Sequence, residues 1–142
     1  MSRIYLGVDI GGTTSSVCAA DEQGRLLGEF TLPTGKGEKG WQGTVQQLMG
    51  HAGELVEDDA GPRAIGISCG SPMDREAGII QEPANLPGWK AVPIVGLWQE
   101  AFPGAAVHLE NDANAGALAE YYLGAGRRQR PADLAGAVPA PR

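Results

Sequence analysis

The first segment of the chain that could do chemistry runs from Asp9 to Thr14, where an acidic residue is followed by two glycines and two hydroxyls. Gly11 and Gly12 allow the backbone to turn tightly and to expose consecutive N–H groups beside the hydroxyl of Thr13. Such a concavity binds phosphate oxygens, and a nearby carboxylate can hold the water shell of Mg²⁺. The segment has neither the lysine of a Walker loop nor the glycine spacing of a Rossmann fold. A plain hairpin turn with a polar cap is the alternative.

A second candidate is the run Glu110-Asn111-Asp112, where a strand is expected to lead into a helix. At the carboxyl end of a strand, Asp112 could accept the proton of a substrate hydroxyl, as phosphoryl transfer to an alcohol requires. Asn111 offers both a donor and an acceptor, which suits the hydroxyls of a sugar. Asn and Asp are also preferred N-cap residues, so an ordinary helix start is the alternative.

A third candidate is the proline-flanked turn PANLPGW, residues 83–89. It presents one amide, Asn85, and one indole, Trp89, a combination that occurs in sugar sites. Trp89 would equally suit a packed core.

The elements that must position these residues follow from hydrophobic patterning and turn residues. Three short strands joined by glycine turns predict an antiparallel meander over residues 4–32. A helix is predicted over about 41–58, because its apolar residues recur at spacings of three and four. A strand with no polar alternation is predicted over 64–70, as in a sheet covered on both faces. A short helix over 92–102, a strand over 105–109 and a helix after residue 112 complete the prediction.

Length and composition are those of one globular domain. The chain has 142 residues, a formal net charge of −6 and 42% hydrophobic residues, which is ordinary globular usage. The two cysteines, Cys18 and Cys69, have no metal-ligand spacing and are predicted to be buried, reduced thiols. The N-terminal apolar run is too short for a signal peptide, and no segment is long enough to span a membrane. We therefore expect a cytoplasmic protein with no membrane partner.

The last 16 residues differ in composition from the rest. Residues 1–126 carry seven basic and 16 acidic side chains, whereas residues 127–142 carry four arginines and one aspartate. No periodic apolar face occurs there, so a domain over 1–126 and a disordered basic tail over 127–142 are predicted. Four arginines without aromatic residues are weak support for a nucleic-acid partner, and none is expected.

Taken together, these residues resemble the ROK family of bacterial sugar kinases and repressors, in the hexokinase/actin-like ATPase superfamily. The resemblance runs through GVDIGGTT (7–14), GISCGSPMD (66–74), EPANLPGW (82–89) and ENDANAGALAE (110–120), and ends with YLGAGR (122–127). It covers about residues 3–127. It implies an α/β fold of the ribonuclease-H type, with a mixed five-stranded sheet that begins with antiparallel hairpins and carries helices on its faces.

The resemblance also implies roles for individual residues. The first phosphate loop for ATP and its Mg²⁺ would comprise Asp9, Gly11, Gly12 and Thr13. The side chains that hydrogen-bond the sugar would be those of Asn85, Asn111 and Asp112, with backbone contacts from Gly70. Asp112 would also be the general base that deprotonates the attacking hydroxyl.

The chain departs from the family pattern downstream. A full kinase continues with a Gly-Thr-Gly phosphate loop, a zinc site of His and clustered Cys, and an adenosine pocket, and none of these occurs in the 142 residues. His51 and His108 belong to no cysteine cluster, so no zinc site is predicted. The composition change at residue 127 suggests that the reading frame is lost or truncated where a second domain should begin; a natural short product is the alternative. We expect negligible turnover by this chain alone.

Three function classes remain open at this point. The first is an ATP-dependent hexose kinase, with glucose favoured because the ANLPGW segment (84–89) looks most like that of glucokinases. N-acetylmannosamine, N-acetylglucosamine and fructose remain open as substrates. The second is a non-catalytic sugar-binding lobe or remnant. The third is a fragment of a ROK repressor, which would need a DNA-binding domain before the phosphate loop. The resemblance leaves self-association of a full-length form open.

Overall fold

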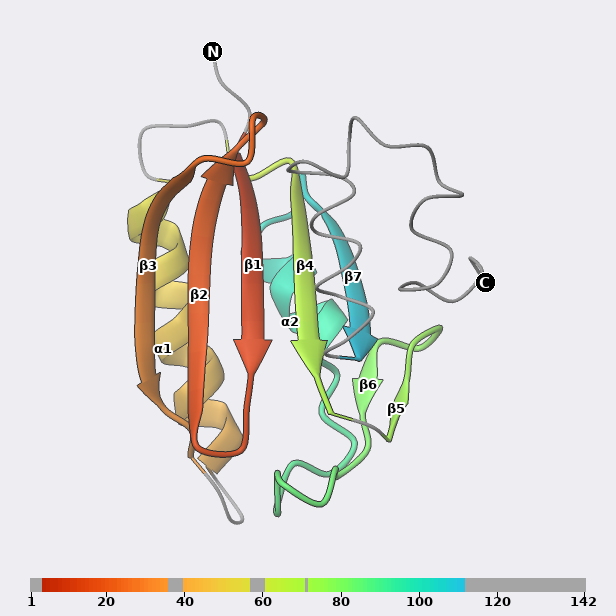
Figure 1. Cartoon of the computed structure of the whole chain (residues 1–142). Helices are drawn as coiled ribbons and strands as arrows, with labels where there is room; N and C mark the ends of the chain where they lie inside the picture. Colours follow the sequence, from red (N-terminus) through yellow and green to blue (C-terminus); the bar gives the residue numbers. More distant parts are fainter. Residues whose placement is uncertain (1–3, 36–39, 57–60, 71, 112–142) are drawn as a thin grey trace, which may run out of the picture.

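The computed structural model describes residues 4–35, 40–56, 61–70 and 72–111. Seven strands and two helices occur within these ranges (Figure 1). In chain order they are β1 (Ile4–Ile10), β2 (Thr14–Asp21), β3 (Leu26–Pro33), α1 (Gly40–Leu55), β4 (Ala64–Cys69), β5 (Met73–Asp74), β6 (Ile79–Ile80), α2 (Ile94–Ala101) and β7 (Ala106–Asn111).

Five of the strands form one mixed sheet in the order β3-β2-β1-β4-β7. The first three make an antiparallel meander, and β1, β4 and β7 are parallel to one another. The meander arises because short turns join its strands, whereas the parallel pairs need the crossovers that contain α1 and α2. The remaining two strands, β5 and β6, form a small separate hairpin. The predicted five-stranded mixed sheet is therefore confirmed.

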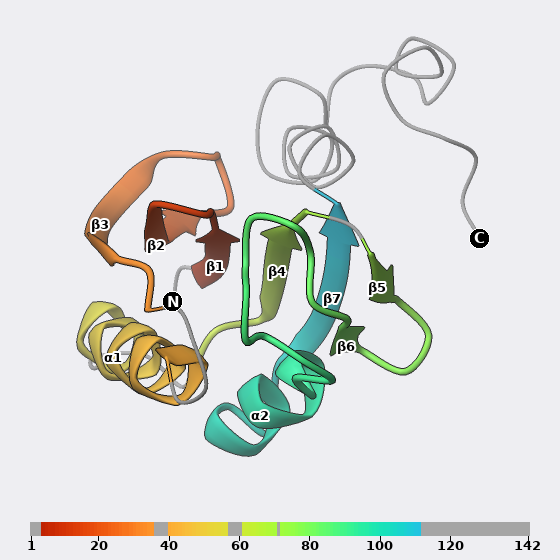
Figure 2. The same ribbon diagram turned by 90° about the horizontal axis from the view of Figure 1, so that it is seen from below.

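Both helices pack on the same face of the sheet (Figure 2). The side chains of the strands alternate, so every second residue of β1, including Leu6, Val8 and Ile10, is buried beneath the helices. The buried face of α1 supplies Val45, Leu48 and Ala52 to this core. Non-directional burial of apolar surface holds the layers together. Among the described residues, neither helix is long and apolar enough to cross a membrane.

The element boundaries differ from the predicted ones by a few residues. The first helix ends at Leu55 instead of residue 58, and the last strand continues to Asn111 instead of ending at residue 109. The expectation that β4 is covered on both faces was wrong at Gly66, which is exposed while Ile65 and Ile67 are buried. The pattern misled because the open face of β4 carries three small residues, Ala64, Gly66 and Ser68, of which only Ser68 is polar. The helix predicted after residue 112 and the tail predicted over 127–142 lie outside the described residues.

The two cysteines are free thiols, as predicted, but their burial differs. Cys69 is fully buried, whereas Cys18 lies on the open face of the sheet and is only half-buried. The prediction of burial was therefore wrong for Cys18. Its apolar neighbours in the sequence do not show that alternate residues of β2 face away from the helices.

Candidate functional site

The parallel strands of the main sheet end at one edge, and the candidate residues lie there. The strand register places Ile10, at the end of β1, beside Cys69 of β4, and Cys69 beside Asn111 of β7. The loop from β6 to α2, which carries Asn85, runs below this edge (Figures 1 and 2). Ligands of α/β proteins bind at the carboxyl ends of parallel strands. The fold thus gathers segments that are far apart in the sequence.

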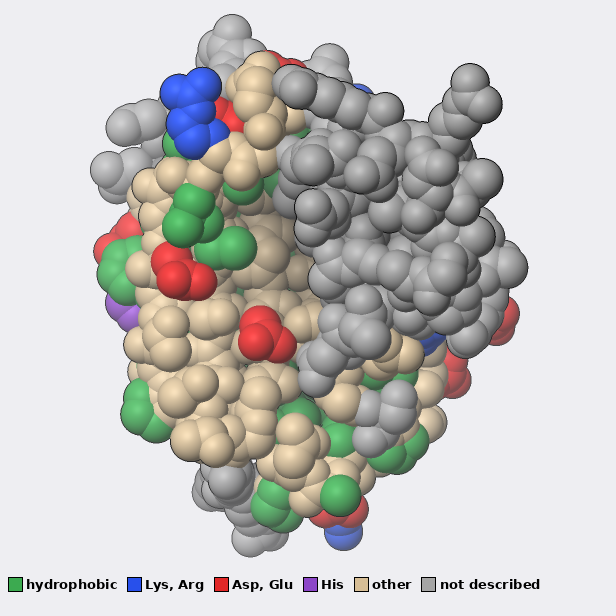
Figure 3. All heavy atoms as spheres, in the orientation of Figure 1, with side chains coloured by type: hydrophobic (Ala, Val, Ile, Leu, Met, Phe, Trp, Pro, Cys, Tyr) green, Lys and Arg blue, Asp and Glu red, His purple; other side chains and the backbone are tan. Residues whose placement is uncertain are grey.

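Asp9 presents its carboxylate on the open face of the sheet. Leu6, Val8 and Ile10 are buried on the other face, while Asp9 is exposed, as the strand alternation predicted. In the register Asp9 lies beside Ser68 of β4, whose hydroxyl donates a hydrogen bond to Asp9 Oδ1 at 2.9 Å. Over β1 to β3 this face consists largely of backbone and polar side chains, with acidic groups among them (Figure 3). Asp9 therefore keeps an oriented, solvent-accessible carboxylate.

The turn between β1 and β2 is fixed by hydrogen bonds at both ends. The N–H of Gly11 donates to the carbonyl of Thr14 at 3.1 Å, and the N–H of Thr34 donates to the carbonyl of Thr13 at 2.9 Å. A Cβ atom on Gly11 would lie 2.8 Å from the Thr14 oxygen, so only glycine fits there. The Gly11 amide closes the turn, whereas the amides of Gly12 and Thr13 donate to no backbone carbonyl within the described part of the chain and could donate to an anion.

Asn85 lies between Gly12, in the β1–β2 turn, and Gly70, which follows β4. A Cβ atom on Gly12 would lie 3.0 Å from both the Cβ and the carbonyl oxygen of Asn85. A Cβ atom on Gly70, which follows β4, would lie 3.3 Å from the side-chain oxygen of Asn85. Asn85 itself is exposed. The structure thus brings together three residues predicted to act at one site.

The loop that carries Asn85 is anchored by two fully buried side chains, Leu86 and Trp89. The Trp89 N–H donates to the carbonyl of Leu86, and the Gly88 N–H donates to the Glu82 carboxylate at 3.0 Å. The indole N–H of Trp89 donates to the carbonyl of Gly35 at 2.8 Å. Trp89 is therefore a core residue that also fixes the loop, which agrees with the packing alternative drawn from the sequence.

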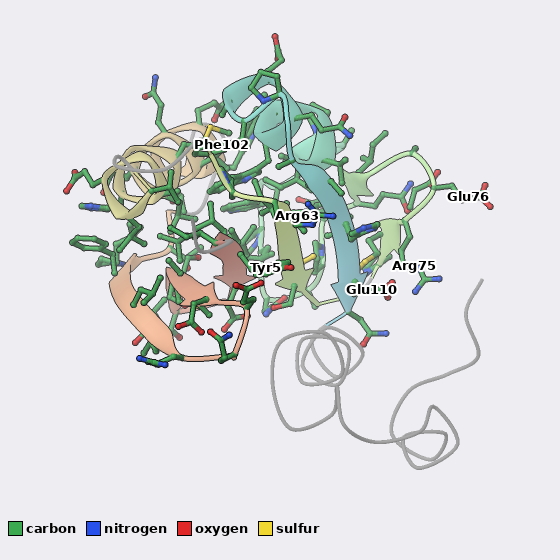
Figure 4. All side chains as sticks on the ribbon, turned by 90° about the horizontal axis from the view of Figure 1, so that it is seen from above. Tyr5, Arg63, Arg75, Glu76, Phe102 and Glu110 are labelled. Atoms are coloured by element: carbon green, nitrogen blue, oxygen red, sulfur yellow. The ribbon has the colours of Figure 1, made fainter. Side chains whose placement is uncertain are left out.

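The end of β7 is held by an ion pair. Arg75, from the turn after β5, pairs with Glu110 of β7, and both side chains are partly buried (Figure 4). The next residue, Asn111, is partly buried at the end of the strand. It is the last residue of β7, which continues two residues beyond the predicted strand end at 109, and the helix predicted after residue 112 lies outside the described residues. Asp112, the predicted general base, lies outside the described residues.

Two residues at this edge were not singled out from the sequence. Ser68 orients Asp9. The sequence feature that could have identified it is the position of its hydroxyl, which alternates with the buried side chains of β4. Thr34 holds the β1–β2 turn, and no local pattern marks it, since its partners are 19 and 23 residues away.

A metal ion would find few protein ligands here. Among the described residues, no three His, Cys, Asp or Glu side chains are grouped so that they could hold a metal. Asp9 fits Mg²⁺ nonetheless, because that ion keeps several waters and is bound by one or two carboxylates together with phosphate oxygens.

The model of the ROK family matches residues 5–132. This chain belongs to the ROK family. Over 124 residues it is 39% identical to a glucokinase from Thermotoga maritima, and the match covers 86% of this chain but 38% of that enzyme.

Solved structures of ROK proteins share the fold. A ROK hexokinase from Thermus thermophilus is 35% identical, with a TM-score of 0.68, over 87% of this chain and 40% of that one. A glucokinase from Streptomyces griseus, in complex with glucose and AMPPNP, is 31% identical, also with a TM-score of 0.68, over 87% of this chain and 38% of that one. The mixed sheet with its helices is thus the N-terminal lobe of a ROK kinase fold. The chain spans about two fifths of the length of these relatives.

Regulators of the same family also match. A transcriptional regulator from Mycobacterium tuberculosis is 29% identical over 123 residues, which cover 85% of this chain and 27% of the regulator. The lobe therefore occurs in sugar kinases and in regulators.

Proposed function

We propose that this chain is the sugar-binding lobe, with the first phosphate loop, of an ATP-dependent hexose kinase. The observation that carries the proposal is the position of Asn85, which lies against Gly12 of the β1–β2 turn and against Gly70 after β4. Phosphoryl transfer needs the attacking hydroxyl next to the phosphate, and catalysis depends mainly on such positioning. A sugar held by Asn85 would lie beside the turn that is suited to phosphate.

The phosphate side of the site would consist of Asp9, Gly12 and Thr13. The amides of Gly12 and Thr13 would donate to phosphate oxygens, and Gly11 would shape the turn. Asp9 would hold the water shell of Mg²⁺, because its carboxylate is exposed and oriented by Ser68. When bound, Mg·ATP supplies the phosphoryl group and the counter-charge for it.

The sugar side would consist of Asn85, Asn111 and Asp112, with the backbone of Gly70. Asn85 and Asn111 can each donate to and accept from sugar hydroxyls. Asp112 follows directly after Asn111, and we assign it the role of accepting the proton from the attacking hydroxyl. Glucose is the favoured hexose, because several relatives are glucokinases and one of the solved structures holds glucose. An ATP-dependent kinase would act in the cytoplasm.

This chain alone should bind ligands without appreciable turnover. Its 142 residues contain no Gly-Thr-Gly phosphate loop. Kinases of this superfamily close two lobes over the transferring phosphoryl group to exclude water. Each charge-assisted contact that a two-lobed kinase makes and this chain lacks costs about 1.5–3 kcal/mol of binding free energy. The affinity of this chain for ATP should therefore be lower than that of a two-lobed kinase by orders of magnitude.

Calorimetric titration with glucose and a coupled ADP-release assay test the proposal. We expect weak, millimolar glucose binding that Asn85→Ala abolishes, while Gln47→Ala, an exposed position on α1 behind the sheet, leaves it unchanged. Binding that is unaffected by Asn85→Ala would overturn the site assignment.

A non-catalytic sugar-binding lobe is the second candidate, and the match to regulators favours it. The two candidates differ in nucleotide binding, because only the kinase lobe should bind Mg·ATP at the β1–β2 turn. Glucose binding without any detectable binding of Mg·ATP supports the non-catalytic lobe. Robust glucose-dependent ADP release would instead contradict both that reading and the low turnover expected above.

A further inference from the structure

The two residues that follow β3, Thr34 and Gly35, contact both loops of the proposed site. The Thr34 hydroxyl donates to the carbonyl of Gly11 at 2.7 Å. A hydroxyl has one proton, so the 2.6 Å hydrogen bond between Thr34 and Ser15 is donated by Ser15. With the bond from the Thr34 N–H to the carbonyl of Thr13, three hydrogen bonds fasten the β1–β2 turn and the start of β2 to this one residue.

The next residue, Gly35, fastens the other loop. Its carbonyl accepts the indole N–H of Trp89 at 2.8 Å, and Trp89 belongs to the loop that carries Asn85. Its N–H donates at 2.8 Å to the hydroxyl of Thr44 in α1. A Cβ atom on Gly35 would collide with the backbone of Gly40, so the segment is pressed against the start of the helix.

Burial makes these hydrogen bonds costly to break. Thr34 is 8% exposed, Ser15 1% and Trp89 0%. Leaving a buried polar group without a partner costs more free energy of folding than one average hydrogen bond contributes. The two loops also touch directly, through Gly12 and Asn85. Movement of the Thr34–Gly35 segment would therefore change the position of both loops.

We propose that Thr34 and Gly35 form a positioning junction that sets the distance between the phosphate turn and the sugar loop. Neither residue needs to touch a ligand. That the turn binds phosphate and the loop binds sugar rests on the proposed function. The link between the two segments rests on the hydrogen bonds of Thr34 and Gly35 and on the burial of these groups.

The first test replaces the Thr34 hydroxyl and measures binding. Thr34→Val removes the hydroxyl and keeps the shape; Thr34→Ser keeps the hydroxyl; Thr31→Val makes the same change at an exposed position of β3. We expect Thr34→Val to raise the Kd for Mg·ATP about tenfold, which corresponds to 1.4 kcal/mol, and the Kd for glucose about threefold. Thr34→Ser and Thr31→Val should stay within twofold of the unsubstituted chain. A lower Tm with both Kd values unchanged would overturn the junction and leave the proposed function standing.

The second test needs no ligand. Amide hydrogen exchange reports whether Gly11 and Trp89 open together. Trp89→Phe removes the bond to Gly35, and Trp98→Phe is the matched control, since Trp98 is as fully buried and its indole N–H has no partner among the described residues.

We expect Trp89→Phe to speed exchange at Gly11, and Thr34→Val to speed it at Trp89, each relative to the amides of β4. Trp98→Phe should not change the exchange at Gly11. If each substitution affects only its own loop, the junction is refuted. If the unsubstituted chain binds neither ligand, the proposed function fails, and the exchange data still decide whether the junction exists.

Discussion

Gly12 and Asn85 are packed so closely that a single added methyl group on Gly12 would lie 3.0 Å from two atoms of Asn85. This contact joins a turn of the first hairpin to a loop more than 70 residues further along the chain. It is a direct contact between the phosphate side and the sugar side of the proposed site.

Gly12→Ala should therefore damage the site. The new methyl group would push the loop of Asn85 away, and we expect glucose and Mg·ATP each to bind at least fivefold more weakly. Gly50→Ala is the control, because a Cβ atom there meets nothing within 4 Å. That change in a helix should raise the free energy of unfolding by about 0.5–1 kcal/mol. Unchanged binding in Gly12→Ala would show that the two loops are not coupled by this contact.

Asp9→Asn should separate the two ligands. The amide still accepts the hydrogen bond from Ser68, but the negative charge is lost. We expect the Kd for Mg·ATP to rise at least tenfold while the Kd for glucose stays within twofold. Glu29→Gln removes another exposed charge from the same face and should change neither value. An equal loss of glucose binding in Asp9→Asn would contradict the assignment of Asp9 to the phosphate side.

The Arg75–Glu110 ion pair should stabilise the end of β7. Both side chains are partly buried, at 24% and 19% exposed, so the pair is less screened than a surface salt bridge. We expect Arg75→Gln to lower the free energy of unfolding by about 1–2 kcal/mol, and Arg63→Gln, at an exposed position, to change it by less than about 0.5 kcal/mol. Urea unfolding measures both. A double-mutant cycle with Glu110→Gln that gives no coupling would refute the role of the pair.

Cys18 should react slowly with alkylating reagents. Burial raises the pKa of its thiol, the negative charge of Glu29 raises it further, and a backbone hydrogen bond from Gly7 lowers it in part. Because the thiolate is the nucleophile, the labelling rate should rise only above the ordinary thiol pKa of about 8.5. The stability that the neutral thiol contributes should be lost as pH rises through the same range. Iodoacetamide labelling at a series of pH values, followed by peptide mass spectrometry, measures how the labelling rate of Cys18 depends on pH. A midpoint at or below the pKa of a free thiol would contradict the prediction.

Much of the fold could be predicted from local patterns. The alternation in β1 and the apolar spacing of α1 each reflect burial on one face, so Asp9 and Val45 were assigned to the correct sides. The end of the last strand was predicted two residues early, at 109 instead of Asn111, because Asn and Asp are preferred at a helix start and so suggested that the strand had already ended. The links made by Thr34 and by Arg75 were not foreseen, since each depends on partners that only the tertiary fold brings close.

The most direct test of the central claim is a glucose titration of the ¹⁵N-labelled chain followed by amide chemical shifts. The account predicts saturable, millimolar shifts that are largest at Gly12, Gly70 and Asn85, and that Asn85→Ala removes. Shifts that are absent, or that lie on α1 and α2 behind the sheet, would contradict a sugar site at the carboxyl ends of β1, β4 and β7.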